Sequence, residues 1–293
     1  MKSLCILLTI FMTATMVQAQ DLPAYRFYNH NGKKVKFKKV VKKLADYDIV
    51  LFGEHHNNSI NHWLQLQLTQ ALYDAKDGKI MLGAEMFERD NQEGLQLYLS
   101  ETIDDKELAD TVRLWGNFKT DYKPLVDFAQ KQKLQFVATN VPRRYASVIA
   151  KKGQDSLQSQ VTQQEKAYMA KLPIEVDIQT PGYQAMLDMM KGHSGMGDPM
   201  NFVAAQAIKD ATMAASILEN LKEGTLFLHY NGDYHSKEYG GIYWYLKKAN
   251  PNLTIAVISV FESTEQNLSL PEEEELILTE FNLVFPADMT KTY

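Results

Sequence analysis

The chain has 293 residues, of which 45% are hydrophobic, and its formal net charge is −5. This composition is typical of a globular protein with an extensive core, built as one large α/β domain or two modest ones. The acidic balance argues against a nucleic-acid partner, and the single cysteine excludes a framework of internal disulfides.

Residues 1–19 have the pattern of a secretory signal peptide. Lys2 precedes the apolar run from Leu4 to Met12, and the small residues up to Ala19 suit cleavage at that point. The apolar run is too short to span a bilayer. Because the only cysteine, Cys5, lies inside this segment, we expect the mature chain to lack a thiol nucleophile and a lipoprotein acylation site. The expected location is the periplasm or the envelope.

Residues 33–43 contain seven lysines spaced between apolar residues, which predicts a short strand followed by a short helix. Such a run usually forms a solvated face. A role in steering an anionic ligand is the alternative.

Apolar runs alternate with amphipathic segments through the rest of the N-terminal half. This alternation predicts a parallel, doubly wound sheet, with strands at 49–53, 79–84 and 134–139 and helices at 57–75, 121–133 and 143–151.

The segment at about 154–221 shows no strand pattern and is expected to form a helical lid, with helices at 163–171, 182–191 and 201–221. The sheet resumes with strands at 225–230 and 254–260 around a helix at 237–248, followed by an edge strand at 276–281. The expected fold is therefore a three-layer α/β domain over residues 20–293, with a mainly parallel, doubly wound sheet and a helical lid insertion.

Polar side chains follow several of these strands directly. Glu54 and His55 end the first apolar run, Glu85 and Asn140 end later ones, and His235 follows the strand at 225–230. Ligands of open α/β sheets bind beyond the carboxyl ends of the strands, so we expect these residues to line one crevice. A structural protein without a ligand would leave them unexplained.

Several strings of residues resemble the ChaN-like haem-binding family of the Tiki superfamily, over roughly residues 45–245. They are Leu51 to Asn57 (LFGEHHN), Ala84 to Gln92 (AEMFERDNQ), Asn140 to Arg143 (NVPR) and the segment from Phe202 to Met213. The resemblance implies an iron-regulated, haem-binding envelope protein. The wider superfamily also includes proteases and erythromycin-esterase-like hydrolases with a related rim of Glu and His.

Two features depart from the family pattern. The turn from Asn231 to His235 differs by one residue from the usual Gly-x-Gly-His turn. Many relatives are lipoproteins with a cysteine at the signal-peptide cleavage site, and this chain has none there. Membrane attachment through a lipid is therefore not expected.

Haem requires a flat apolar slot, an axial ligand and donors for two propionates. His193, in a glycine-rich loop, is the preferred axial ligand. The full set of candidate haem-binding residues is His193, Tyr183, Met196, Tyr234, Arg89, Arg143 and Asn140. The expected partners are haem or a porphyrin, a second copy of the chain around the ligand, and the outer-membrane uptake machinery.

The rival hypothesis is a hydrolase. With a divalent metal ion, the ligands would be His55, His56, Glu85 and His235. Without a metal, His55 would act as a general base oriented by Glu54 or Glu85; the candidate catalytic set is then Glu54, His55, Glu85 and His235. Because the chain has no Gly-x-Ser-x-Gly turn, a serine nucleophile of that type is not expected.

Overall fold

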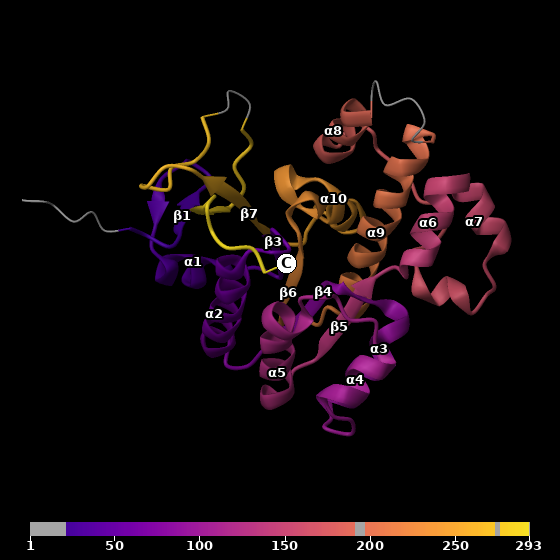
Figure 1. Cartoon of the computed structure of the whole chain (residues 1–293), viewed down its shortest axis with the longest axis horizontal. Coiled ribbons are helices and arrows are strands. Elements are labelled where there is room, and N and C mark those ends of the chain that lie inside the picture. Colours follow the sequence, from indigo (N-terminus) through magenta and orange to yellow (C-terminus); the bar gives the residue numbers. More distant parts are fainter. Residues whose placement is uncertain (1–21, 191–196, 273–275, 293) are drawn as a thin grey trace, which may run out of the picture.

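The computed structural model describes residues 22–190, 197–272 and 276–292. Its centre is one eight-stranded sheet in the order β2-β1-β8-β7-β3-β6-β4-β5 (Figure 1). The strands from β8 to β5 in this order run parallel, whereas β1 is antiparallel to both β8 and β2. The strands are β1 (Arg26–Asn29), β2 (Lys34–Val35), β3 (Ile49–Glu54), β4 (Ile80–Glu88), β5 (Phe136–Asn140), β6 (Leu226–Gly232), β7 (Ile255–Ser263) and β8 (Phe281–Pro286).

Helices cover both faces of the sheet, as expected for a three-layer fold. They are α1 (Phe37–Leu44), α2 (Ser59–Ala75), α3 (Gln92–Leu99), α4 (Asp105–Thr111), α5 (Lys123–Gln132), α6 (Arg143–Lys152), α7 (Gln154–Gln160), α8 (Pro181–Met190), α9 (Pro199–Asn220) and α10 (Gly241–Ala249). Short 3-10 turns, η4 (Asp233–His235) and η5 (Lys237–Tyr239), follow β6.

The alternation of side chains along β3 shows how the two faces are filled. Val50 and Phe52 belong to the apolar core shared with α2, while Ile49 and Leu51 belong to the core shared with α9 and α10. A strand buried on both faces is a nearly continuous apolar run, and β3 is such a run until Gly53. The mainly parallel α/β fold predicted from the sequence is confirmed.

Between β5 and β6 the described residues are helical or irregular. α6, α7, α8 and α9 share a separate apolar core, which includes Ile149, Leu157, Tyr183 and Val203. α9 begins at a capped end, because the Asp198 side chain accepts the Met200 backbone N–H at 2.9 Å.

Three element predictions differ from the structure. The strand predicted at 276–281 is β8 at Phe281–Pro286, and it lies inside the sheet between β7 and β1 instead of at an edge. The helix predicted at 163–171 is a short 3-10 turn at Glu165–Tyr168, whereas α7 forms just before it. The helix predicted at 237–248 starts later, at Gly241, because the backbone kinks at Glu238.

The segment predicted to be a signal peptide, with Cys5, lies outside the described residues. Within the residues that are described, no helix has the length and apolar character needed to cross a bilayer.

Candidate functional site

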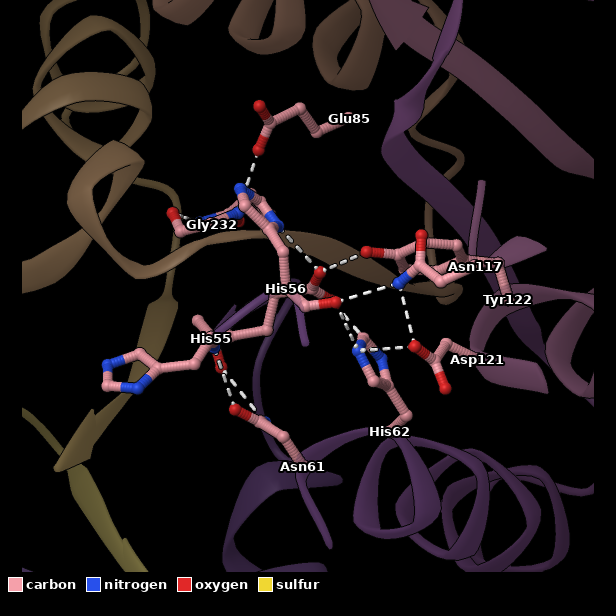
Figure 2. Close-up of polar contacts among 12 residues, drawn as sticks. His55, His56, Asn61, His62, Glu85, Asn117, Asp121, Tyr122 and Gly232 are labelled. Atoms are coloured by element: carbon pink, nitrogen blue, oxygen red, sulfur yellow. Dashed lines mark hydrogen bonds and ion pairs between the residues drawn. The ribbon is translucent and has the colours of Figure 1, made fainter. Parts of the chain in front are cut away.

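The candidate site lies where the adjacent strands β3, β6 and β4 end. Glu54 is the last residue of β3 and pairs in register with Gly232, the last residue of β6. Glu85 comes from β4, on the other side of β6, so the two glutamates flank Gly232. The Glu85 side chain points towards Gly232 (Figure 2). Both carboxylates are buried. Parallel strands thus bring together residues that are far apart in the chain.

Glu54 is fully committed to hydrogen bonds. Tyr122 Oη donates to its Oε1 at 2.7 Å, Gln65 Nε2 donates to its Oε2 at 2.6 Å, and His56 Nδ1 lies 2.9 Å from Oε1. Burial alone would raise the pKa of the Glu54 carboxyl, but the charge of His62 and the hydrogen bond from His56 hold it below its ordinary value. Glu54 is therefore an anion that fixes the His56 ring.

His56 lies between the two glutamates. A Cβ atom added at Gly232 would come within 2.9 Å of its Nε2, so only glycine leaves room for the ring in this position. The edge of the ring packs against Trp115 with 4.9 Å between centroids. Burial alone would lower the pKa of His56, but the hydrogen bond to Glu54 and the charge of Glu85 raise it.

Glu85 is held from two sides. The Gly232 backbone N–H donates to its Oε2 at 2.7 Å, and His235 Nε2 lies 3.1 Å from its Oε1. The other ring nitrogen of His235, Nδ1, bonds Asp210, and Gln206 Nε2 lies 3.1 Å from that nitrogen. Although burial acts against both charges, the ion pair lowers the pKa of Glu85 and the two carboxylates raise the pKa of His235 to about 10.

Asp210 extends this cluster to α9. Its Oδ2 accepts a hydrogen bond from Tyr183 Oη at 2.7 Å, and all three side chains of the row Tyr183, Asp210 and His235 are buried. Asp210 is not among the site residues expected from the sequence. The sequence does contain an indication of its role, because Asp210 is a single acid on an otherwise apolar, alanine-rich helix face. A buried carboxylate needs a partner.

These pKa shifts limit the chemistry of the cluster. A general base must be unprotonated near neutral pH, yet His235 with a pKa of about 10 is an imidazolium under those conditions. Glu85 and Glu54 are weak bases because their pKa values are lowered. The cluster is a fixed array of paired charges, able to donate hydrogen bonds and to orient a neighbouring group.

His55 does not belong to this array. Its ring points away from His56 and Glu85 (Figure 2). Its Nδ1 lies 3.3 Å from Glu262 Oε1 on β7, and its ring packs edge-on against Phe285 of β8. Burial lowers the pKa of His55, although the hydrogen bond to Glu262 opposes this effect. The prediction that Glu54 or Glu85 orients His55 is wrong, because His56 is the imidazole that Glu54 holds.

The predicted metal ligands are not arranged as a metal site. His55, His56, Glu85 and His235 make the separate ion pairs described above, and in the described ranges no group of three or more His, Cys, Asp or Glu side chains is placed to hold a metal ion. The geometry gives the metal-dependent alternative no support.

The candidate axial ligands of haem differ in their availability. Tyr183 is buried and bonded to Asp210, and burial together with that carboxylate raises the pKa of its phenol far above the ordinary value. Tyr234 in η4 is instead 65% exposed, with Lys237 Nζ 4.3 Å from its ring centroid. The remaining candidates, His193 and Met196, lie outside the described residues.

The candidate donors to the haem propionates also differ in whether they already have partners. Arg89 is already paired with Glu219 at 2.7 Å and donates to Ser216 Oγ at 3.2 Å. Arg143 is exposed at the start of α6 and forms no ion pair with another described residue. Asn140 is buried at the end of β5, and its Oδ1 has no hydrogen-bond partner among the described residues.

A pocket of about 850 Å³ is lined in part by Trp115, the residue that packs against His56. Its walls come from the end of β4, the loop before η2 (Phe118–Tyr122) and the first turns of α6. The lining residues are Met86, Glu88, Arg113, Leu114, Trp115, Gly116, Asn117, Arg143, Arg144 and Ser147. Arg113 and Arg144 pair with Glu88 and Asp90 of this region, so Arg143 is the cation left for a ligand.

Comparison with known proteins identifies the family. Among solved structures, the chain is similar to that of ChaN of Campylobacter jejuni, described as cofacial heme binding, with 18% identity, a TM-score of 0.65, and coverage of 90% of this chain and 97% of that chain. The type III effector HopBA1 matches with 13% identity and a TM-score of 0.46 over 84% of this chain and 91% of its own. The sequence has no match among curated proteins.

The family model described as haem-binding uptake, Tiki superfamily, ChaN matches residues 40–246. This range includes β3 to β6 and every side chain of the buried cluster from Glu54 to His235. Because the model covers most of the sequence, the chain belongs to the ChaN family of haem-binding uptake proteins in the Tiki superfamily.

Proposed function

We propose that this protein binds haem on an exposed apolar face next to Tyr234 and acts as a haem-binding component of the cell envelope. Membership of the ChaN family is the observation that carries the proposal. The family match supports haem as the ligand. The described side chains support the place of binding and the axial ligand.

A concentration of exposed apolar side chains in one part of the chain supports this place of binding. Five of the eight large apolar side chains that are exposed in the described structure fall between residues 178 and 234, namely Ile178, Met189, Met200, Phe202 and Tyr234. Their elements contact one another, because α8 packs against α9 and a Cβ atom at Gly182 of α8 would lie 3.7 Å from the Tyr234 carbonyl oxygen. Exposed apolar side chains on neighbouring elements make this region a candidate for a ligand site.

Tyr234 is the axial ligand that the described residues offer. Its phenol is exposed and Lys237 stands beside its ring, so an anionic oxygen formed there would have a cation close by. Tyrosinate is an established ligand of haem iron. Tyr183, the other tyrosine candidate, is withdrawn from solvent by its bond to Asp210.

A second copy of the chain fits this arrangement. The similar Campylobacter structure is described as cofacial heme binding, which supports two haems stacked between two apolar faces. We therefore propose that haem loading brings two copies together at the Tyr234 face, with Arg143 as a donor to a propionate. An envelope location is part of the proposal and rests on the signal-like N-terminal sequence.

Hemin titration tests the proposal. The wild-type chain should develop a shifted Soret band. Tyr234→Phe should weaken hemin binding by at least about tenfold, because loss of a residue that only hydrogen-bonds to a metal ligand already weakens metal binding by that factor. Tyr183→Phe, which removes an equivalent phenol from a buried position, is the matched control and should bind hemin normally. Size-exclusion chromatography with and without hemin reports the pairing of two copies.

Two results would contradict these statements separately. An unchanged hemin spectrum for the wild-type chain would overturn haem binding itself. Normal binding by Tyr234→Phe together with a lost Soret shift in His193→Ala would leave haem binding in place and move the axial ligand to His193.

A further inference from the structure

One edge of the molecule carries a concentrated positive charge that the haem-binding site does not use. β2 and α1 form this lysine face, whose exposed members are Lys33, Lys34, Lys36, Lys38, Lys39, Lys42 and Lys43. No acidic residue occurs between positions 33 and 43, and removing these seven from the 31 basic residues leaves 24 against 36 acidic ones. The segment thus has a formal charge of +7 in a chain whose remainder carries −12.

The lysines of this face are free to meet a partner. Among residues 22–190, 197–272 and 276–292, no ion pair joins any of them to a carboxylate. α1 is fixed to the core by Val40 and Leu44, which are fully buried, so its orientation is set and its lysines stay on the outside. Such a fixed array of like charges is unfavourable by itself and attracts an extended anionic surface.

An aromatic row borders the lysine face. Phe37, the first residue of α1, contacts Phe27 of β1 with 6.2 Å between ring centroids; Tyr25 lies 5.8 Å from Phe27, and Trp63 lies 5.9 Å from Tyr25. Trp63 is 49% exposed at the end of this row. A lysine face whose bordering aromatic row ends in an exposed tryptophan suits the boundary between lipid headgroups and acyl chains.

The shape of the face indicates the kind of partner. Five pockets of the described structure, of about 200 to 850 Å³, are lined by other segments, and none of the five includes a residue of the lysine face. All seven lysines are exposed on one strand and one helix, so the array can contact many phosphates at once. We propose that the lysine face docks the protein on an anionic lipid bilayer, with the lysines on lipid phosphates and Trp63 at the headgroup boundary.

Docking in this way leaves the proposed haem face uncovered. α1 lies at the opposite side of the molecule from α8 and α9 (Figure 1). The acidic remainder of the chain is repelled by the same bilayer, so the two charges together orient the molecule with α8 and α9 away from the lipid. The inference does not depend on haem binding.

Vesicle sedimentation of the full chain tests the docking. We expect wild-type protein to bind vesicles containing phosphatidylglycerol and to be released at about 0.5 M salt, where charges are screened beyond a few ångströms. Substituting Lys33, Lys34, Lys38 and Lys39 together by Gln should lower the partition by at least about tenfold, because each lysine near an anionic membrane contributes separately. The matched control substitutes four exposed lysines elsewhere, Lys106, Lys131, Lys151 and Lys166, and should bind as wild type does.

Further measurements separate the possible partners. Vesicles of phosphatidylcholine alone measure binding that does not depend on lipid charge, and should capture little of any variant. Tryptophan emission should shift to the blue on binding phosphatidylglycerol vesicles, and Trp63→Phe should remove most of this shift.

Three outcomes would overturn the proposal. One is equal partition of wild type and the lysine-face variant, with circular dichroism showing both folded. Another is complete release by millimolar inorganic phosphate at constant ionic strength, which would indicate a discrete phosphate site. The third is binding to soluble polyphosphate without any binding to vesicles, which would identify a soluble polyanion as the partner.

Discussion

The His235 imidazole is held between two carboxylates, with Nε2 3.1 Å from Glu85 Oε1 and Nδ1 bonded to Asp210. Glu85 and Asp210 come from β4 and α9, so the ring joins the sheet to the helix that packs on it. All three side chains are buried, and the imidazolium form satisfies both acids at once. Removing it leaves two buried charges without their cation.

This arrangement predicts a pH-dependent contribution to stability. The folded-state pKa of His235 is raised from 6.5 to about 10, so its contribution is complete below pH 6.5 and is lost as the pH rises towards 10. The pKa of Glu85 is lowered, so its contribution is present above pH 4.5 and is lost on acidification. His235→Gln should cost about 3 kcal/mol near pH 6.5, the lower end for breaking a buried pair.

Urea unfolding at a series of pH values provides the measurement. The gap in the free energy of unfolding between wild type and His235→Gln should narrow as the pH approaches 10. A gap that stays constant over this range would show that His235 is neutral in the folded protein.

Glu54→Gln should lower the pKa of His56. The hydrogen bond to Glu54 is a main cause of the raised pKa of His56, so this pKa should fall towards or below 6.5 in the variant. We also expect the free energy of unfolding to fall by about 1–3 kcal/mol, because one hydrogen-bond donor to the carboxylate would meet the amide NH₂ group of Gln instead of an acceptor. NMR titration of the histidine ring protons measures the change.

Glu262→Gln serves as the control for this titration. Glu262 bonds His55 and not His56, so the variant should lower the pKa of His55 and leave that of His56 unchanged. A His56 titration that is the same in wild type and Glu54→Gln would refute the assigned contact.

Gly232→Ala should displace the His56 ring. The new methyl group would lie 2.8 Å from His56 Cε1, closer than real contacts allow, while Glu54 and Trp115 hold the ring on its other sides. We expect this overpacking to lower the free energy of unfolding by about 1–3 kcal/mol. Gly116→Ala is the matched control, since nothing lies within 4 Å of its added methyl group. Equal melting temperatures for the two variants would argue against the close approach.

Tyr183→Phe and Tyr234→Phe should have opposite effects. Tyr183 donates a buried hydrogen bond to the Asp210 carboxylate, so its loss should cost about 1.5–3 kcal/mol of stability without weakening hemin binding. Tyr234 is exposed, so its loss should weaken hemin binding without lowering the melting temperature. Thermal unfolding and hemin titration of both variants give the comparison. If Tyr183→Phe alone lost hemin, the phenol–Asp210 pair would have to open for binding.

The sequence predicted most of the parallel sheet because buried strands are continuous apolar runs. β3 and β6 could be located in this way, and their polar ends correctly indicated Glu54 and the turn that leads to His235. The place of β8 could not be found, because pairing with β7 and β1 depends on contacts between segments far apart in the chain. Local periodicity carries no information on such pairing.

Which side chains of the site meet was only partly predictable. His55 and His56 are adjacent and chemically equal, and the direction of the backbone after β3 decides which ring reaches Glu54. Asp210 lies 125 residues after Glu85 on a helix, so the third member of the His235 cluster could not be derived from strand ends. Tyr183 had the residue type of a haem ligand, but its burial against Asp210 depends on how α8 packs on α9.

The position of β6 between β3 and β4 has a consequence for biosynthesis. When the ribosome has made β3 and β4, Glu85 of β4 still lacks the Gly232 amide and the His235 ring, which are encoded more than a hundred codons later. Without these partners the Glu85 carboxylate would have to stay hydrated, so this end of β4 cannot be buried early. We infer that the sheet is completed only when the last third of the polypeptide has been synthesised, so the ion pair of Glu85 and His235 forms late in folding.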